Sequence, residues 1–328
     1  MAIRIVVDVM GADRPPEELL AGALAAGKRL PVHLILAGRR RLIEPHLPED
    51  AHAEVLDCEE FVPPDAPPVQ AVRKKGTSIL RGLELLASGK AEAFLSPGNT
   101  GAVVAAALLV LGRIPGVKRP GLCASIPTLQ GRELLLIDAG ATADPKPLHL
   151  VQFADMGLLY AQEVLGIPEP KLGLLSIGTE ETKGDKLVRA SHRLLSGRPE
   201  FVGNVEPHEL VIQRPVDIVV TGGFAGNLTI KALEGGAEAI WEAMKQTLAS
   251  SFRAQLGAVL LRPWLVQLAK RMRYDRYNGA PLLGVQGLVM VAHGRSSAAA
   301  MEAAVERTFW AAQAQLVDRI AVKLAESA

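Results

Sequence analysis

A chain of 328 residues, 49% of them apolar and only 4% aromatic, can bury one large aliphatic core or two modest ones. Its 36 Lys and Arg nearly balance its 35 Asp and Glu, so no overall charge would draw the protein to nucleic acid. No run reaches the 18 or so apolar residues of a membrane span, and the cysteines, Cys58 and Cys123, lack metal-ligand spacing. We therefore expect a cytoplasmic globular protein with two buried thiols and no bound metal.

Seven strand-like runs recur along the chain, with helical patterns between them. In chain order they are IRIVVDV at the start, VHLILA from Val32, AFLS from Ala93, LLLIDAG from Leu134, LGLLSIG from Leu172, DIVVTGG from Asp217 and LVMVAHG from Leu288. This alternation predicts an α/β fold in which a mostly parallel sheet is covered by helices on both faces.

The strand signal is absent from residues 239–276, where the pattern is helical. We predict a helical arm here, inserted into an α/β body formed by residues 1–238 and 277–328. The arm holds a local cluster of cations beside Trp264, namely Arg262, Lys270, Arg271, Arg273 and Arg276. Such a cluster predicts a contact with an acidic partner or an anionic lipid surface, and a dimer-contact helix is the alternative for the apolar residues.

The stretch SPGNTGA follows the third run and opens a helical pattern. The first N–H groups of a helix are unpaired and carry partial positive charge, so a turn of small residues at this point can receive an anion such as phosphate. The candidate phosphate-binding residues are Ser96, Gly98, Asn99, Thr100 and Gly101. An ordinary N-cap is the alternative explanation.

Three further turns follow strand-like runs. Residues 178–184 include Lys183, residues 222–227 include Asn227 at a helix start, and His293 follows the last run. Asn227 could donate from its neutral amide to an oxyanion, with capping as the alternative, and His293 could equally be a polar end to a buried strand. We expect these turns to gather along the carboxyl edge of the sheet, where ligands bind.

Familiar catalytic signatures are missing. The chain has no G-x-G-x-x-G, no H-E-x-x-H and no G-x-S-x-G, so a standard dinucleotide turn, a zinc hydrolase and a nucleophile elbow lose support.

Eight motifs in order between residues 8 and 297 carry a family resemblance. They are DVMGADRPPEE, SPGNTGA, RPGLCASIPT, DAGATADPKPLHLVQFADMG, LGLLSIGTEETKGDKL, FVGNVEP, TGGFAGNLTIKALEG and YNGAPLLGVQGLVMVAHGRSS. Together they resemble the bacterial acyl-[acyl-carrier-protein]:phosphate acyltransferases of phospholipid synthesis, over nearly the whole chain.

The resemblance implies a three-layer α/β/α sandwich related to phosphate acetyltransferases and to isocitrate and isopropylmalate dehydrogenases. It implies transfer of a long acyl chain from the thioester of acyl carrier protein to inorganic phosphate, with no cofactor. It also implies a homodimer at the membrane periphery, with the downstream glycerol-3-phosphate acyltransferase as a candidate partner. The family's lysine and asparagine match Lys183 and Asn227 and are expected side by side.

Our hypothesis from these expectations is direct attack of phosphate on the thioester. Asn99, Thr100 and the charge of Lys183 would hold phosphate, Asn227 would stabilise the oxyanion, and His293 would hold phosphate or assist proton transfer to the thiolate. Two other functions are left open: a nicotinamide-dependent decarboxylating dehydrogenase, and a non-catalytic membrane adaptor for lipid synthesis.

Overall fold

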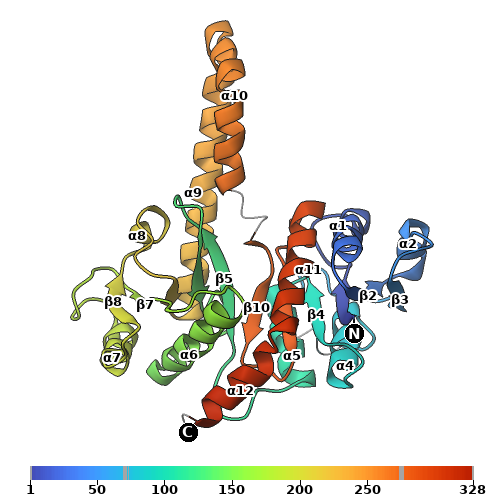
Figure 1. Ribbon diagram of the computed structural model, residues 1–328, viewed down its shortest axis with the longest axis horizontal. Helices are drawn as coiled ribbons and strands as arrows, with labels where there is room; N and C mark the ends of the chain where they lie inside the picture. The colour runs from blue at the N-terminus through green and yellow to red at the C-terminus, as the bar shows by residue number, and fades with distance from the viewer. Residues whose placement is uncertain (1, 69–71, 73, 273–276, 327–328) are drawn as a thin grey trace.

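The computed structural model describes residues 2–68, 72, 74–272 and 277–326, and these form an 11-stranded sheet covered by helices (Figure 1). The strands are β1 (Ile3–Asp8), β2 (Val32–Gly38), β3 (Ala53–Asp57), β4 (Ala93–Ser96), β5 (Gly121–Pro127), β6 (Glu133–Ile137), β7 (Leu172–Leu175), β8 (Phe201–Val205), β9 (Ile218–Val220), β10 (Ala280–Leu283) and β11 (Leu288–Val291). All seven strand-like runs of the sequence are strands, which confirms the predicted α/β fold.

Helices connect most of the strands. They are α1 (Pro16–Arg29), α2 (Arg40–Ile43), α4 (Ser78–Ala87), α5 (Thr100–Val110), α6 (Pro147–Glu163), α7 (Lys186–Leu195), α8 (Pro207–Ile212), α9 (Gly223–Ala249), α10 (Phe252–Met272), α11 (Ala298–Gln313) and α12 (Leu316–Glu326), with a 3₁₀ turn at Glu44–His46. Five of them begin at a side-chain oxygen that accepts the N–H three residues later, from Thr77, Asn99, Asp185, Ser251 and Ser297. Such caps satisfy one of the free N–H groups and fix where a helix starts.

Both faces of the sheet are buried, which is why its strands read as continuous apolar runs. In β1, Ile5 and Val7 lie in one core and Val6 lies in the other; Leu135 and Leu134 alternate in the same way in β6. Helices α1, α6, α11 and α12 pack into the first core, and α4, α5 and α8 into the second. The three-layer α/β/α sandwich is confirmed.

The strand directions reverse in the middle of the sheet. The order is β3-β2-β1-β4-β11-β10-β5-β6-β9-β7-β8, and β10 is antiparallel to both of its neighbours, as β5 is to β6. The other neighbours are parallel. The carboxyl ends of β4 and β11 therefore lie at one edge of the sheet, and those of β6, β7 and β9 lie at the opposite edge.

A pair of helices projects from the body as an arm. Helix α9 begins against β5 and β6, leaves the body, and packs beside α10, which returns along it (Figure 1). The predicted arm boundary at residue 239 falls inside α9, because this helix runs unbroken from Gly223 to Ala249. The arm therefore continues a helix that is rooted in the body.

Candidate active site

The turns that carry Lys183 and Asn227 leave the sheet side by side. Strands β7 and β9 are hydrogen-bonded parallel neighbours, with Leu174 opposite Val220, so the residues that follow them emerge at the same edge. Leu187, at the start of α7, has a side-chain atom 3.5 Å from where a Cβ on Gly222 would lie. The start of α7, which follows the Lys183 turn, thus packs against the turn that leads to Asn227.

Asn227 lies within α9 and does not cap it. The N-cap is Gly222, without a side-chain cap, and Asn227 is exposed. Within the described residues no hydrogen bond engages its amide. A Cβ on Gly140, whose φ is +135°, would lie 3.7 Å from the Asn227 amide nitrogen, so the loop of residues 138–142 faces this side chain. The amide is available as a donor to a ligand.

A buried carboxylate shapes that loop. Asp138 accepts N–H bonds from Leu122 at 2.9 Å, Gly140 at 2.9 Å, Ala141 at 2.8 Å and Thr142 at 2.6 Å. Burial raises the pKa of Asp138, while these four bonds favour the charged form. The loop beside Asn227 is therefore held rigidly by its own backbone.

Lys183 is a loosely paired cation. Its ammonium lies 3.9 Å from a carboxylate oxygen of Glu180, and half of its side chain is exposed. The loop behind it is fixed because the Asn204 amide donates to the Glu180 carbonyl at 2.8 Å, while the Asn204 carbonyl oxygen meets the His192 ring at 3.1 Å. An exposed lysine on an anchored loop can reach an anionic ligand.

The turn at residues 96–101 serves largely as structure. The buried Ser96 hydroxyl donates to Asp8 at 2.7 Å and accepts the Gly98 N–H at 3.1 Å. Asn99 accepts the Ala102 N–H at 2.9 Å, and its amide donates to two backbone carbonyls. These are the contacts expected of an ordinary N-cap, which was the alternative to phosphate binding at this turn. Thr100, the first residue of α5, is exposed.

Asp8 connects this turn to the first strand. Burial raises its pKa to about 6, and the hydrogen bond from Ser96 opposes that rise.

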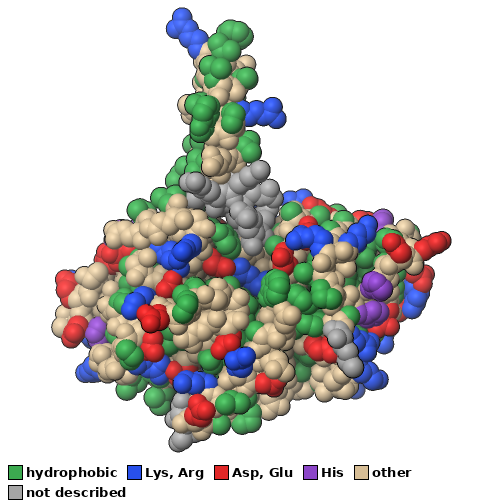
Figure 2. Space-filling view, viewed as in Figure 1, with side chains coloured by type: hydrophobic (Ala, Val, Ile, Leu, Met, Phe, Trp, Pro, Cys, Tyr) green, Lys and Arg blue, Asp and Glu red, His purple; other side chains and the backbone are tan. Residues whose placement is uncertain are grey.

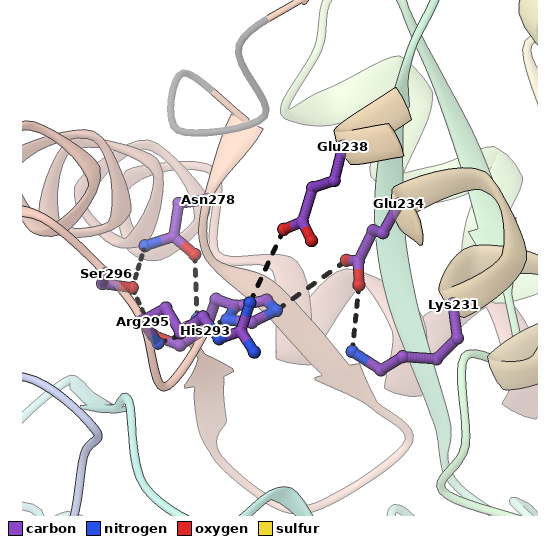
Figure 3. Close-up of polar contacts among 7 residues, drawn as sticks. All are labelled: Lys231, Glu234, Glu238, Asn278, His293, Arg295 and Ser296. Carbon is purple, nitrogen blue, oxygen red and sulfur yellow. Dashed lines mark hydrogen bonds and ion pairs between the residues drawn. The ribbon is translucent and has the colours of Figure 1, made fainter. Parts of the chain in front are cut away.

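His293 is held from both sides (Figure 3). Its backbone N–H donates to buried Asn278 at 3.0 Å, and the Arg295 N–H donates to its Nδ1 at 3.2 Å, so in the neutral ring the proton lies on Nε2. Nε2 lies 3.8 Å from Glu234 on α9, and the other carboxylate oxygen of Glu234 lies 2.9 Å from Lys231. His293, with Lys231, lowers the pKa of Glu234 to about 2 despite partial burial.

The expectation that all four turns gather along one edge is wrong, because the strand directions reverse. The turns form two pairs, one after β4 and β11 and one after β7 and β9. Helix α9 spans between them: Asn227 lies in its second turn and Glu234, two turns further on, reaches His293 (Figure 3). The helix thus couples the two edges of the sheet.

Sequence reasoning missed three groups that organise these turns: Asp138, Asn278 and Glu234. Asp138 opens the motif DAGATADPKPLHLVQFADMG, but its role as the acceptor for four backbone N–H groups leaves no pattern of side chains in the sequence. Glu234 follows Asn227 by seven residues, a spacing that places two side chains on one face of a helix, and this signal could have pointed to it. Among the described residues, no three His, Cys, Asp or Glu side chains cluster as a metal site.

The predicted contact surface of the arm is only partly described. Exposed apolar side chains follow the arm (Figure 2), including Phe252, Leu260 and Trp264, with the exposed Arg262 next to them. Lys270 and Arg271 lie in the last turn of α10. The other two cations of the predicted cluster, Arg273 and Arg276, lie outside the described residues. No helix in the described ranges is both long and apolar enough to cross a membrane.

Comparison with solved structures defines the fold class. The chain resembles a phosphotransacetylase from Streptococcus pyogenes with a TM-score of 0.62 and 17% identity, covering 96% of this chain and 94% of that one. It also resembles a 4-hydroxythreonine-4-phosphate dehydrogenase from Klebsiella pneumoniae, with a TM-score of 0.54 and 13% identity over 95% of this chain and 99% of that one. The fold is the phosphotransacetylase-type α/β sandwich.

Sequence comparison defines the family. A family model described as "Fatty acid synthesis protein" matches residues 3–319. A phosphate acyltransferase of Brevibacillus brevis is 46% identical over 308 residues, 92% of each chain, and one of Desulfitobacterium hafniense is 44% identical over 300 residues, 90% of this chain and 89% of the relative. The chain belongs to the phosphate acyltransferase family. It is therefore an acyltransferase. The two alternatives left open by its sequence, a nicotinamide-dependent decarboxylating dehydrogenase and a non-catalytic membrane adaptor, are wrong.

Proposed function

We propose that the enzyme transfers a long-chain acyl group from the thioester of acyl carrier protein to inorganic phosphate, releasing an acyl phosphate for glycerophospholipid synthesis. The coarser reaction, acyl transfer involving phosphate, follows from the names of its relatives. The carrier, the free phosphate and the product are our inference.

The observation that carries the proposal is the pairing of the Lys183 and Asn227 turns at the ends of two neighbouring strands. A cation and a neutral amide donor at one sheet edge suit a reaction in which an anion attacks a carbonyl. Cys58 and Cys123 are both buried, and burial raises the pKa of the Cys58 thiol to about 11, so neither thiol suits an acyl-enzyme.

The transfer proceeds in two balanced steps. A phosphate oxygen attacks the thioester carbonyl, which becomes a tetrahedral oxyanion that accepts from the Asn227 amide, while Lys183 balances the phosphate charge. The C–S bond then breaks, the carbonyl re-forms, and the thiolate leaves and takes a proton from solvent, because His293 lies at the other edge of the sheet, beside Glu234. Phosphate is already anionic at neutral pH, so positioning and oxyanion stabilisation carry the rate.

The phosphate-binding role of the turn at residues 96–101 is narrower than its sequence suggested. Ser96, Gly98 and Asn99 hold the turn through Asp8 and backbone groups. Thr100 and the helix start at Thr100 and Gly101 can still face an anion, but they lie at the edge of the sheet opposite Lys183 and Asn227, so the attacking phosphate is assigned to Lys183.

The decisive experiment incubates the enzyme with palmitoyl acyl carrier protein, with and without phosphate, and traps the product with hydroxylamine. We expect phosphate-dependent palmitoyl hydroxamate and loss of the thioester by mass spectrometry. Asn227→Ala should lower turnover by roughly 100- to 1,000-fold, the cost of losing an oxyanion donor. Gln246→Ala, which removes an exposed amide from the arm portion of the same helix, is the control; nearly full activity of the Asn227→Ala enzyme would remove Asn227 from the mechanism.

The arm is the proposed contact with acyl carrier protein, the membrane surface or a second subunit, and the downstream glycerol-3-phosphate acyltransferase is a further candidate partner. Its exposed apolar side chains beside Arg262 suit the lipid interface. Flotation with neutral and anionic liposomes tests the membrane contact. Binding to neither leaves acyl carrier protein and a second subunit as the contacts of the arm.

A further inference from the structure

A cavity of about 680 Å³ opens between the end of α5 and the start of α6. Four cationic side chains and one imidazole line it: Arg113, Lys118, Arg119, Lys146 and His149. Its volume lies within the roughly 300–1,000 Å³ typical of small-molecule sites. It was not among the candidate sites drawn from the sequence.

The described residues supply no acidic partner to the cations of the cavity. No carboxylate lines the cavity, and in the described part of the chain none of its four cations forms an ion pair. The Arg113 guanidinium donates to the Lys118 carbonyl, which closes the loop between them without neutralising either charge. Elsewhere on this protein arginines pair readily, as Arg40 does with Glu44 and Arg198 with Asp155. A group of unpaired cations around one cavity points to an anionic ligand.

His149 adds a directed donor. Its Nδ1 accepts the Lys146 N–H at 3.0 Å, so the neutral ring carries its proton on Nε2. Burial, Arg119 and Lys146 lower the pKa of His149, which favours its neutral form. Helix α6, 17 residues long, begins just after Lys146 and adds its positive end.

The cavity adjoins the edge of the sheet where Asn227 lies. Strand β5 begins beside it and is antiparallel to β6, with Cys123 opposite Ile137, so the start of β5 meets the end of β6. The Thr142 hydroxyl donates to the Pro120 carbonyl at 3.0 Å, which ties the cavity wall to the loop that faces Asn227. Pro145, next to Lys146, lies 3.1 Å from the Cβ position of Gly222 at the start of α9. One rigid loop therefore separates the cavity from the amide.

We propose that this cavity binds the phosphate ester of the acyl donor, the phosphodiester of the pantetheine arm that carries the thioester. The inference rests on the proposed donor. The cavity holds roughly 20 water volumes, more than a single phosphate ion fills, so an ester with an organic chain fits it better than free phosphate. Arg119 and Lys146 would grip the phosphate and leave the thioester end of the arm to pass the 138–142 loop to Asn227.

The test measures binding apart from turnover. Calorimetry with 4′-phosphopantetheine, pantetheine and inorganic phosphate, each alone, should show that the phosphorylated arm binds more tightly than pantetheine. Arg119→Gln and Lys146→Gln should each weaken phosphopantetheine binding by about 10-fold, which corresponds to the weakest hydrogen bonds made to charged groups. Binding of pantetheine and of inorganic phosphate should be unchanged. Lys28→Gln, which removes an exposed cation from α1, is the matched control. Arg119 and Lys146 are both exposed, and thermal unfolding should confirm that the two variants fold.

Three outcomes overturn the proposal: unchanged phosphopantetheine affinity in both variants, equal affinity of the wild type for pantetheine and its phosphate, or a loss confined to inorganic phosphate, which would assign the cavity to the co-substrate. Asn227→Ala separates this inference from the proposed function. That variant should keep its phosphopantetheine affinity while losing turnover, so binding can fail or hold independently of catalysis.

Discussion

The tightest packing around the candidate site lies at Gly226, and it offers a sharp test. A Cβ added at this position would lie 2.0 Å from the Asp138 carbonyl oxygen and 3.0 Å from side-chain atoms of Leu136 and Thr221. Gly226 directly precedes Asn227 in α9. The substitution Gly226→Ala therefore pushes the helix that carries the proposed oxyanion donor against the loop that faces it.

The size of the effect follows from the contact. Carbon and carbonyl oxygen approach to about 3.3 Å without repulsion, so the shortfall at 2.0 Å is roughly 1.3 Å, and a backbone oxygen cannot rotate away. The start of α9 must shift by about 1 Å. A displacement of that size at a reacting group costs about 100-fold in rate, and overpacking costs about 1–3 kcal/mol of unfolding free energy.

The assay is phosphate-dependent acyl hydroxamate formation, with urea unfolding of the same samples. Gly236→Ala is the matched control, because a Cβ there meets nothing within 4 Å and alanine favours the helix by up to about 1 kcal/mol. We expect Gly236→Ala to keep activity and to raise the unfolding free energy by at most about 1 kcal/mol. If Gly226→Ala behaved like Gly236→Ala, the packing of α9 on the 138–142 loop would not position Asn227, and the reasoning would fail.

Three other predictions concern titration and thiol chemistry. His293 lowers the pKa of Glu234 to about 2, so the contact between the Glu234 carboxylate and His293 stabilises the fold above about pH 4.5. This stabilisation is lost as the pH falls toward 2. In urea titrations, the unfolding free energy of Glu234→Gln should therefore vary less with pH across that range. The pKa of Asp8 is raised to about 6, so the unfolding free energy should decrease as pH rises from about 4 to 6, and Asp8→Asn should remove this decrease. Cys58 and Cys123 should react with an aromatic disulfide reagent only after unfolding, since both are buried and burial raises both pKa values; rapid labelling of the native enzyme would contradict this.

Much of the fold was predictable because parallel strands buried on both faces leave a clear signal. The runs IVV and LVMV are strongly β-branched or aliphatic and bounded by glycine turns, and both are strands. Four strands were not among the seven runs, including β5 (GLCASIP) and β10 (APLL), whose glycine, proline and small residues give a weak strand signal. These two strands produce the reversal of direction, so missing them led to the wrong expectation of a single site edge.

The candidate site was predictable only as far as local turns reveal it. The resemblance pointed to Lys183 and Asn227, and strand pairing places their turns together. The Asn99 amide donates to backbone carbonyls more than 30 residues away in sequence. Its structural role therefore depends on tertiary contacts that a local turn motif does not reveal. The same holds for the pairing of Glu234 with His293, which lie 59 positions apart by number and on different elements.

The unbroken length of helix α9 links the arm mechanically to Asn227. The helix is a single rod of 27 residues, about 40 Å long, with Asn227 near its inner end and the arm at its outer end. The tilt of the arm and the location of the amide cannot be set independently unless the rod bends, and the adjacent Gly235 and Gly236 are its most pliable point. Whatever binds the outer end of this helix is thereby mechanically linked to Asn227, the proposed oxyanion donor.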